Sequence, residues 1–243
     1  MPFYTSIAKY YDHIFPLENS IVNFIKSKAS RKNEIFMDIG SATGTLSIAM
    51  SDLSKYVIGI DMDKELVSLA NEKISRKDNV RCISGNMLDI KKHVEKGHKV
   101  STISCIGNTL VHLCDTKDMN SFIRSSFELL EKDGRLIIQI INYDRIMKYN
   151  ISSLKTIEND KIVFYRDYET VHDSRLLDFN TRLVIKDEGK HVIENSVKLY
   201  PLLKNELHDM IMEAGFLKTV FFGSYDMEEY AHDSFLTIAV SEK

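Results

Sequence analysis

Between residues 34 and 141 the chain alternates short apolar runs with stretches whose apolar residues recur at helical spacing. The apolar runs cover residues 34–40, 56–61, 80–85, 99–107 and 134–141. The helical stretches cover residues 45–53, 64–74, 87–96 and 118–130. Apolar strands separated by amphipathic helices are typical of βαβ units, in which a parallel sheet is buried on both faces. The pattern therefore predicts a doubly wound α/β sheet.

The pattern changes after residue 141, where segments rich in valine, tyrosine and phenylalanine follow one another without helices. These segments cover residues 161–171, 176–189 and 190–200, and a turn is expected at 187–190. A helical stretch over residues 203–215 and two further strands over 216–223 and 234–243 complete the chain. We therefore expect a small antiparallel β insertion between the fifth strand and the last helix.

The domain organisation follows from the same pattern. We expect a single domain over residues 1–243, because three prolines and ten glycines leave no long linker. Residues 1–30, with several tyrosines, are expected to form an N-terminal helical flap that closes over a site, and the alternative is a plain amphipathic helix that docks on the sheet. Residues 145–203, which hold the β insertion, are expected to form a lid over the substrate.

Bulk properties exclude several classes of protein. The net charge of −3 and a pI near 6.3 provide no general attraction to nucleic acid or to an anionic membrane. No apolar run approaches the roughly 18 residues of a membrane span. Three cysteines without CxxC spacing argue against a disulfide framework and against a cysteine zinc site. No basic-then-apolar signal begins the chain, so we expect a cytoplasmic protein.

The segment "DIGSATG" at the end of the first apolar run combines an acid with small residues at every second position. These residues are Asp38, Gly40, Ala42 and Gly44. The spacing differs from the G-x-G-x-x-G of dinucleotide folds, and no Lys-Ser or Lys-Thr follows as in a P-loop. A carboxylate at this turn would repel a pyrophosphate and would suit a cationic amino group. In an α/β sheet this turn borders the ligand crevice.

This segment resembles the acid-x-Gly-x-Gly-x-Gly signature of the class I S-adenosylmethionine-dependent methyltransferases, with Ala42 in place of the usual middle glycine. The resemblance implies a Rossmann-like seven-stranded sheet, mostly parallel with the last strand antiparallel. It also implies that Asp61 accepts both ribose hydroxyls of the cofactor and that Met62 lies against adenine. The alternative for Asp61 is the cap of the next helix, a position that Asp63 could fill instead.

The third strand leads into "SGNMLD", where the resembled family usually has Asp in place of Asn86. The Asn86 oxygen can still accept a hydrogen bond from the exocyclic amine of adenine, and Met87 would offer its backbone amide to the ring. The alternative for Asn86 is an exposed helix cap.

The fourth strand ends in "ISCIGNTLVHL", which resembles the Gly-Asn-x-x-x-His-Leu segment of glycine and sarcosine N-methyltransferases. The segments "SIAKYYDHIF", "INYDRI" and "LYPLLKNEL" extend the match to nearly the whole chain. The resemblance implies that the backbone of Cys105 flanks the cofactor, that Asn108 faces the methyl acceptor, and that His112 approaches the methionine part. The alternative for His112 is a helix residue packed on the sheet.

Tyrosines complete the implied site. Tyr4 and Tyr11 lie in the expected flap, where a tyrosine of the resembled family reaches the methionine end of the cofactor. Tyr165 and Tyr200 match positions that contact the substrate in that family. The alternative is that these two are ordinary sheet aromatics, since tyrosine favours strands. The implied catalytic residues are thus Asn108, Tyr165 and Tyr200.

The sequence departs from the resembled family at one position that bears on the substrate. The glycine-methylating enzymes have "RNYD", whose arginine clamps the substrate carboxylate, and here the segment reads "INYD", with Ile141 in that place. Isoleucine cannot replace a bidentate clamp, so neither glycine nor sarcosine is carried over as substrate. Arg145, Arg166 or Arg182 could compensate from another direction.

We therefore expect an S-adenosylmethionine-dependent methyltransferase that moves a methyl group to a small-molecule acceptor, an amine nitrogen, and releases S-adenosylhomocysteine. In-line displacement needs orientation and exclusion of water, so no metal is expected. The alternatives are a methyltransferase for RNA or protein, which would need a basic face or an added module, and a binding protein for the cofactor without catalysis. A nicotinamide dehydrogenase is a further alternative. Neither the acceptor nor the oligomeric state follows from the sequence.

Overall fold

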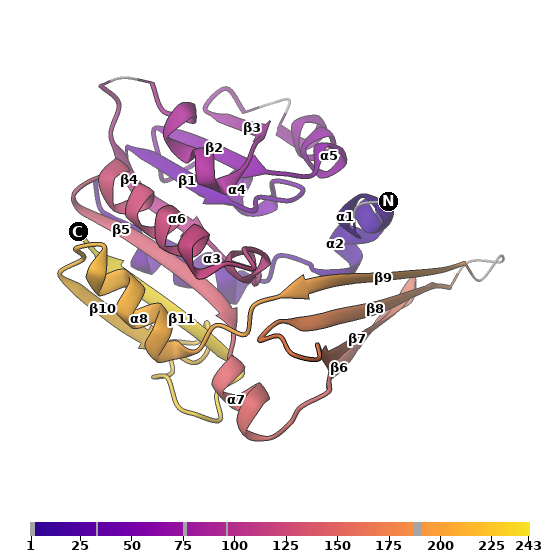
Figure 1. Cartoon of the computed structure of the whole chain (residues 1–243). Helices are drawn as coiled ribbons and strands as arrows, with labels where there is room; N and C mark the ends of the chain where they lie inside the picture. The colour runs from indigo at the N-terminus through magenta and orange to yellow at the C-terminus, as the bar shows by residue number, and fades with distance from the viewer. Residues whose placement is uncertain (1–2, 33, 75–76, 96, 187–190) are drawn as a thin grey trace.

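The computed structural model describes residues 3–32, 34–74, 77–95, 97–186 and 191–243. Its larger sheet has seven strands in the order β10-β11-β5-β4-β1-β2-β3 (Figure 1). The strands are β1 (Ile35–Ile39), β2 (Tyr56–Asp61), β3 (Val80–Ser84), β4 (Val100–Cys105), β5 (Leu130–Ile141), β10 (Lys218–Phe222) and β11 (Leu236–Glu242). Only β11 runs antiparallel to the rest, because it pairs antiparallel with both β5 and β10. The predicted fold class is confirmed.

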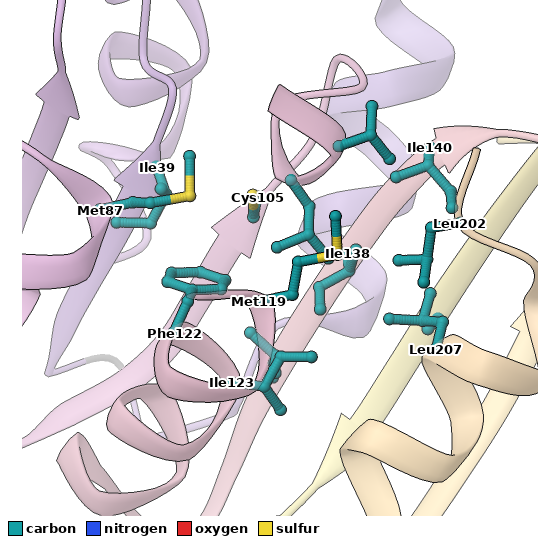
Figure 2. Close-up of a cluster of buried hydrophobic side chains, with 14 of the residues drawn as sticks. Ile39, Met87, Cys105, Met119, Phe122, Ile123, Ile138, Ile140, Leu202 and Leu207 are labelled. Atoms are coloured by element: carbon teal, nitrogen blue, oxygen red, sulfur yellow. The ribbon is translucent and has the colours of Figure 1, made fainter. Parts of the chain in front are cut away.

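Helices cover both faces of this sheet. The first face carries α3 (Asn19–Lys28), α4 (Thr45–Met50) and α5 (Lys64–Ile74), and the second carries η2 (Met87–His93), α6 (Thr116–Leu129) and α8 (Lys204–Glu213). Asp115 starts α6 by accepting a hydrogen bond from the Lys117 N–H at 2.8 Å. Figure 2 shows Met119, Phe122 and Ile123 of α6 packed toward the sheet. Their i, i+3, i+4 spacing gives the helix one apolar face.

The β insertion forms a second sheet of four antiparallel strands, in the order β6-β7-β8-β9. The strands are β6 (Ser153–Glu158), β7 (Ile162–Thr170), β8 (Leu177–Ile185) and β9 (Val192–Leu199). Strand β6 was not predicted, because Leu154 is its one buried residue and an edge strand of polar residues has no apolar alternation. Helix α7 (Tyr143–Lys148) was also missed. The expected turn at 187–190 lies outside the described residues.

The N-terminal helices lie between the two sheets (Figure 1). Helix α1 (Phe3–Ile7) contacts both α5 and β9, and α2 (Tyr11–Ile14), which follows the short η1 (Ala8–Tyr10), contacts β7. Phe3, Ile7 and Ile14 are buried against Phe164 and Leu183 of the second sheet. This packing holds the start of the chain over the carboxyl ends of the parallel strands.

The strand order reverses between β1 and β4, which are neighbours although β2 and β3 come between them in sequence. In doubly wound sheets such a reversal opens a crevice beyond the carboxyl ends of the strands, where ligands bind. Among the described residues, no helix combines the length and the apolar character that crossing a membrane requires.

Candidate active site

A cleft of about 670 Å³ lies at this reversal, at the carboxyl ends of β1 to β4 and under the N-terminal helices. Its volume falls within the roughly 300–1,000 Å³ typical of small-molecule sites. The predicted cofactor residues that line it are Tyr4, Tyr11, Gly40, Ala42, Asp61, Met62, Met87 and His112. The fold thus brings predicted cofactor residues from distant segments of the chain to one cleft.

The glycine-rich turn is held by the end of the neighbouring strand. The N–H groups of Gly40 and Ser41 both donate to the Ile60 carbonyl, at 2.8 and 3.1 Å. Gly40 has a φ of +72°, and Ala42 has a φ of +46°. Ala42 therefore adopts the left-handed backbone that favours glycine, which explains why glycine is usual at this place.

The Asp61 carboxylate stabilises the same turn from the end of β2. One of its oxygens accepts the Ala42 N–H and the other accepts the Asp63 N–H, both at 2.9 Å. Burial raises the pKa of Asp61, and the backbone hydrogen bonds oppose that rise. Asp63 caps α5 by accepting the N–H groups of Glu65 and Leu66, at 3.0 and 3.1 Å. The capping position considered for Asp61 is thus filled by Asp63, and the Asp61 oxygens keep free lone pairs beside the cleft.

Asp38 does not reach the cleft, contrary to the expectation that its carboxylate meets a cationic amino group. It is only 2% exposed, and its oxygens accept the hydroxyls of Ser47 at 2.8 Å and Ser104 at 3.0 Å. Burial raises its pKa to about 6, although the two serine hydroxyls act in the opposite direction. The carboxylate joins β1, α4 and β4 beneath the glycine-rich turn.

Three more predicted cofactor residues lie outside the cleft lining. Gly44, with a φ of +73°, precedes α4, and a Cβ there would lie 3.0 Å from that of Ala70 in α5. Asn86 caps η2 by accepting the Leu88 N–H at 2.9 Å, as its alternative interpretation proposed. Cys105 is buried in the core at the end of β4.

Methionines provide an apolar surface within the cleft. Met62 is 69% exposed, although most large apolar side chains of the chain are buried, and Met87 is buried beside it in the lining. An exposed apolar side chain in a concave site is typical of a surface that packs against a ligand ring.

Tyr4 and His112 meet at the cleft, the first from α1 and the second from η3 (Leu110–His112). The Tyr4 hydroxyl and His112 Nε2 are 2.9 Å apart, and their rings are edge-on with centroids 5.5 Å apart. Burial lowers the pKa of His112 to about 4, so its imidazole is neutral at pH 7. Burial, with the Asp61 carboxylate as a smaller cause, raises the pKa of Tyr4, which keeps its proton. In the tautomer with its proton on Nδ1, the neutral imidazole can accept a hydrogen bond from the phenol.

The lowered pKa of His112 makes stability depend on pH. The unfolded chain takes up this proton near pH 6.5 and the folded chain only near pH 4, so His112 lowers the free energy of unfolding as pH falls through that window. Its contribution amounts to about 3 kcal/mol. Asp38 acts in the opposite direction, because its folded-state pKa is raised to about 6. The pH dependence of wild-type stability therefore does not show either contribution by itself, because the two act in opposite directions.

Comparing the stability of His112→Gln with that of the wild type isolates the contribution of the histidine. We expect His112→Gln to gain about 3 kcal/mol relative to the wild type between pH 7 and pH 4, because glutamine does not titrate. Urea unfolding at a series of pH values measures this difference. A difference that stays constant across the window would show that His112 titrates normally.

Asn108 differs most from its predicted position. Its side chain lies outside the cleft lining, although Gly107 and Thr109 on either side of it are part of that lining. Its oxygen accepts the Ile141 N–H at 3.0 Å, and its Nδ2 donates to the Tyr143 hydroxyl at 3.0 Å. The amide thus joins the β4 loop to the end of β5. Its φ of +68° is one that asparagine tolerates better than most residues.

Asn108→Ala is accordingly expected to reduce stability as well as turnover. It removes the acceptor of the Ile141 N–H and one partner of the Tyr143 hydroxyl, and an unsatisfied buried group costs roughly 1–3 kcal/mol. Urea unfolding should show a loss of about 2 kcal/mol or more. A variant as stable as the wild type but inactive would instead support direct contact with the acceptor.

The two predicted substrate tyrosines also point elsewhere. The guanidinium carbon of Arg182 lies 4.1 Å from the centroid of the Tyr165 ring. Both side chains are on the face of the second sheet opposite to that of buried Phe164. Tyr200 is buried, and the Arg175 guanidinium lies 4.8 Å from its ring centroid. Neither lines the cleft. A one-residue step along a strand moves a side chain to the other face, so resemblance in a strand does not settle its direction.

Several lining residues were not predicted. They are Phe3, Thr5, Ile39, Ile60, Asp63, Lys64, Glu65, Leu66, Gly85, Thr109 and Val197. Most of them neighbour predicted residues at strand ends, so the topology alone could have indicated them. Val197 comes from the second sheet, and no signal in the sequence connects it to the strand ends.

Comparisons with known proteins agree with this architecture. A family model described as "Methyltransferase domain" matches residues 30–215. A glycine/sarcosine N-methyltransferase from Aphanothece halophytica is 24% identical over 223 residues, which cover 90% of this chain and 80% of that protein.

Two solved structures extend the likeness to the fold. An S-adenosylmethionine-dependent methyltransferase from Clostridium acetobutylicum superposes with a TM-score of 0.80 at 14% identity, covering 98% of both chains. An amino pentose methyltransferase from Micromonospora echinaspora superposes with a TM-score of 0.65 at 14% identity, covering 92% of this chain and 89% of the other.

The family model spans most of the chain, and the chain therefore belongs to the methyltransferase domain family. It is a methyltransferase. The predicted resemblance to the class I S-adenosylmethionine-dependent enzymes and to the glycine/sarcosine branch is confirmed.

Proposed function

We propose that the cleft binds S-adenosylmethionine, the cofactor of this class, and that the enzyme transfers its methyl group to an amine nitrogen of a small molecule. The observation that carries the proposal is the neutral His112 imidazole hydrogen-bonded to Tyr4 beside Gly107. The relative from Aphanothece halophytica is named as an N-methyltransferase, and the enzyme from Micromonospora echinaspora acts on an amino pentose.

The residues of the cleft fit this cofactor. Free lone pairs on the Asp61 carboxylate can accept two ribose hydroxyls, and the exposed Met62 can cover one face of an adenine ring. Gly40, at the turn, permits close approach of the methionine part. When bound, the cofactor supplies a methyl group on a sulfonium sulfur, already activated for displacement.

The remaining task of the chain is to orient a neutral amine. With the His112 proton on Nδ1, Nε2 accepts a hydrogen bond from the Tyr4 hydroxyl, and the Tyr4 oxygen keeps lone pairs that can accept an N–H of the acceptor. This hydrogen bond would direct the nitrogen lone pair toward the methyl carbon. Alignment of this kind can account for roughly 7–11 kcal/mol of a barrier.

We further propose that residues 1–30 act as a flap and residues 145–203 as a lid. The flap is tied to the rim of the cleft, because Thr5 donates to the Asp63 carboxylate and Thr43 donates to that of Asp12, each at 2.5 Å. Val197 of the lid and Tyr4 of the flap both line the cleft. Closure by these two segments would exclude water from the methyl group.

The test measures binding and transfer separately. Calorimetric titration with S-adenosylmethionine should show binding, and mass spectrometry should detect methylated product from a panel of amines but not from matched alcohols or thiols. Methylation of alcohols alone would overturn the amine assignment. Binding without transfer to any acceptor would favour a non-catalytic binding protein, and salt-sensitive binding of RNA would favour the nucleic-acid alternative.

A further inference from the structure

Three buried polar atoms without a hydrogen-bond partner lie together on the second sheet. They are Arg166 Nε, the Tyr168 hydroxyl oxygen and Thr181 Oγ1; none has a hydrogen-bond partner within 3.5 Å among the described residues, although the Tyr143 hydroxyl lies near that of Tyr168. Tyr168 is 5% exposed and Thr181 is likewise buried. Buried polar groups are nearly always paired, so three unpaired ones side by side need an explanation.

Strand pairing places all three on one face. Arg166 of β7 lies directly opposite Thr181 of β8, and Tyr168 follows two residues after Arg166 on the same face. Phe164 and Leu183, also on this face, are buried against the N-terminal helices. We call this the inner face of the second sheet.

The inner face adjoins the wall of the cleft at Val197. Tyr168 lies opposite Phe179, and Phe179 lies opposite Val197, which lines the cleft. Two strand spacings, about 10 Å, therefore separate Tyr168 from the cleft wall. Tyr168 also faces Tyr143 of the main domain, with ring centroids 6.2 Å apart.

The positive charge of Arg166 indicates which kind of ligand these three residues would bind. Arg166 Nη2 donates to the Lys155 carbonyl at 2.6 Å, and among the described residues the arginines that pair with carboxylates are Arg135 and Arg175 rather than Arg166. Burial lowers the pKa of Arg166, as expected for a cation removed from water without a counter-ion. A partly buried guanidinium is costly unless an anion pairs with it. All three groups can donate a hydrogen bond, which suits the oxygens of an anion.

We propose that Arg166, Tyr168 and Thr181 form a subsite that binds an oxyanion, such as a carboxylate, carried by the methyl acceptor. This proposal rests on the proposed function, since the acceptor must reach from the cleft to the inner face. Arg166 is then the compensating arginine among the three considered, because Arg182 stacks on Tyr165 on the outer face. The acceptor is an amine whose anionic group lies several bonds from the nitrogen.

The first experiment uses sulfate as probe and does not depend on turnover. The full chain loaded with S-adenosylhomocysteine is titrated with sulfate at fixed ionic strength, as wild type, Arg166→Gln, Tyr168→Phe and Arg182→Gln. We expect Arg166→Gln to weaken sulfate binding about ten- to a hundred-fold, with a smaller loss for Tyr168→Phe. Arg182→Gln, a matched loss of charge on the opposite face of the same strand pair, should bind like the wild type.

The outcomes are distinct. Absence of sulfate binding to the wild type, or equal binding by Arg166→Gln, overturns the subsite, and so does an equal loss in Arg182→Gln. Affinity for S-adenosylhomocysteine reports whether each variant is folded. If Arg166→Gln fails to fold, Tyr168→Phe and Thr181→Val, which each remove one donor, carry the same test.

The second experiment separates this proposal from the proposed function. Methyl transfer is compared between amines with a carboxylate and the same amines as carboxamides, for example 4-aminobutyrate and 4-aminobutanamide. We expect the wild type and Arg182→Gln to prefer the carboxylates by about ten-fold or more in kcat/KM, and Arg166→Gln to lose that preference. Sulfate binding without methylation of any amine would overturn the amine function and leave the anion site standing. Methylation without a preference for carboxylates would overturn the subsite alone.

Discussion

Replacing Gly40 by valine is expected to abolish measurable cofactor binding and to lower the free energy of unfolding by about 2–5 kcal/mol. Gly40 has a φ of +72°, and a Cβ at this position would lie 2.4 Å from Thr109 Oγ1 and 2.6 Å from its Cγ2. Thr109 cannot easily move, because its hydroxyl donates to the Ile106 carbonyl at 2.7 Å. The branched side chain would therefore displace either the glycine-rich turn or the β4 loop, and both line the cleft.

Backbone strain and steric conflict can be separated with a second glycine. Gly97 has a φ of +95°, and a Cβ there would meet nothing within 4 Å. Gly97→Ala should therefore lose about 1–2 kcal/mol from strain alone and retain normal affinity for S-adenosylmethionine. Urea unfolding and calorimetric titration measure both quantities. Normal cofactor affinity in Gly40→Val would show that the turn does not contact the cofactor.

Asp61→Ala is expected to reduce affinity for S-adenosylmethionine by at least about ten-fold, since hydrogen bonds to a charged acceptor contribute roughly 1.5–3 kcal/mol each. The proposed ribose contacts would be lost, and the Ala42 N–H would lose its acceptor at 2.9 Å. Because Ala42 is in the left-handed region, losing this hydrogen bond would weaken the turn, which the Gly40 and Ser41 hydrogen bonds to the Ile60 carbonyl would still hold. The loss of the ribose contacts and the weakening of the turn would both reduce cofactor affinity.

A conservative variant distinguishes the two effects. Asp61→Asn keeps one carbonyl oxygen for the Ala42 N–H and removes the charge, so it should restore the turn but only part of the affinity. Titration of both variants with S-adenosylmethionine, with circular dichroism as a check on folding, provides the comparison. Wild-type affinity in Asp61→Ala would remove Asp61 from the cofactor site.

The fold could be predicted where local patterns are strong. The expected helix over residues 64–74 coincides with α5 (Lys64–Ile74), because Leu66, Val67, Ala70 and Ile74 recur at helical spacing on one buried face. The parallel strands were equally clear, because strands buried on both faces are continuously apolar. Strand β6 was not found, because an exposed edge strand needs no such pattern.

The position of the site was also predictable. In a parallel sheet all carboxyl ends meet at one edge, so the turns after β1, β2 and β4 had to converge. The sequence therefore predicts that Gly40 and Asp61 lie at one cleft, and the resemblance adds Tyr4 and His112; all four line it. These assignments depend on where the backbone goes, which the order of elements determines.

The direction of individual side chains was decided only by tertiary structure. Asp38 is turned inward by Ser47 and Ser104, and Asn108 is held by Ile141 and Tyr143, which no local pattern connects to it. On β7, a step of one residue separates the outer face from the inner face, where Arg166 Nε and the Tyr168 hydroxyl have no hydrogen-bond partner within 3.5 Å among the described residues. A hydrogen bond needs a partner within about 3 Å, and the chain brings such partners together only when distant segments pack.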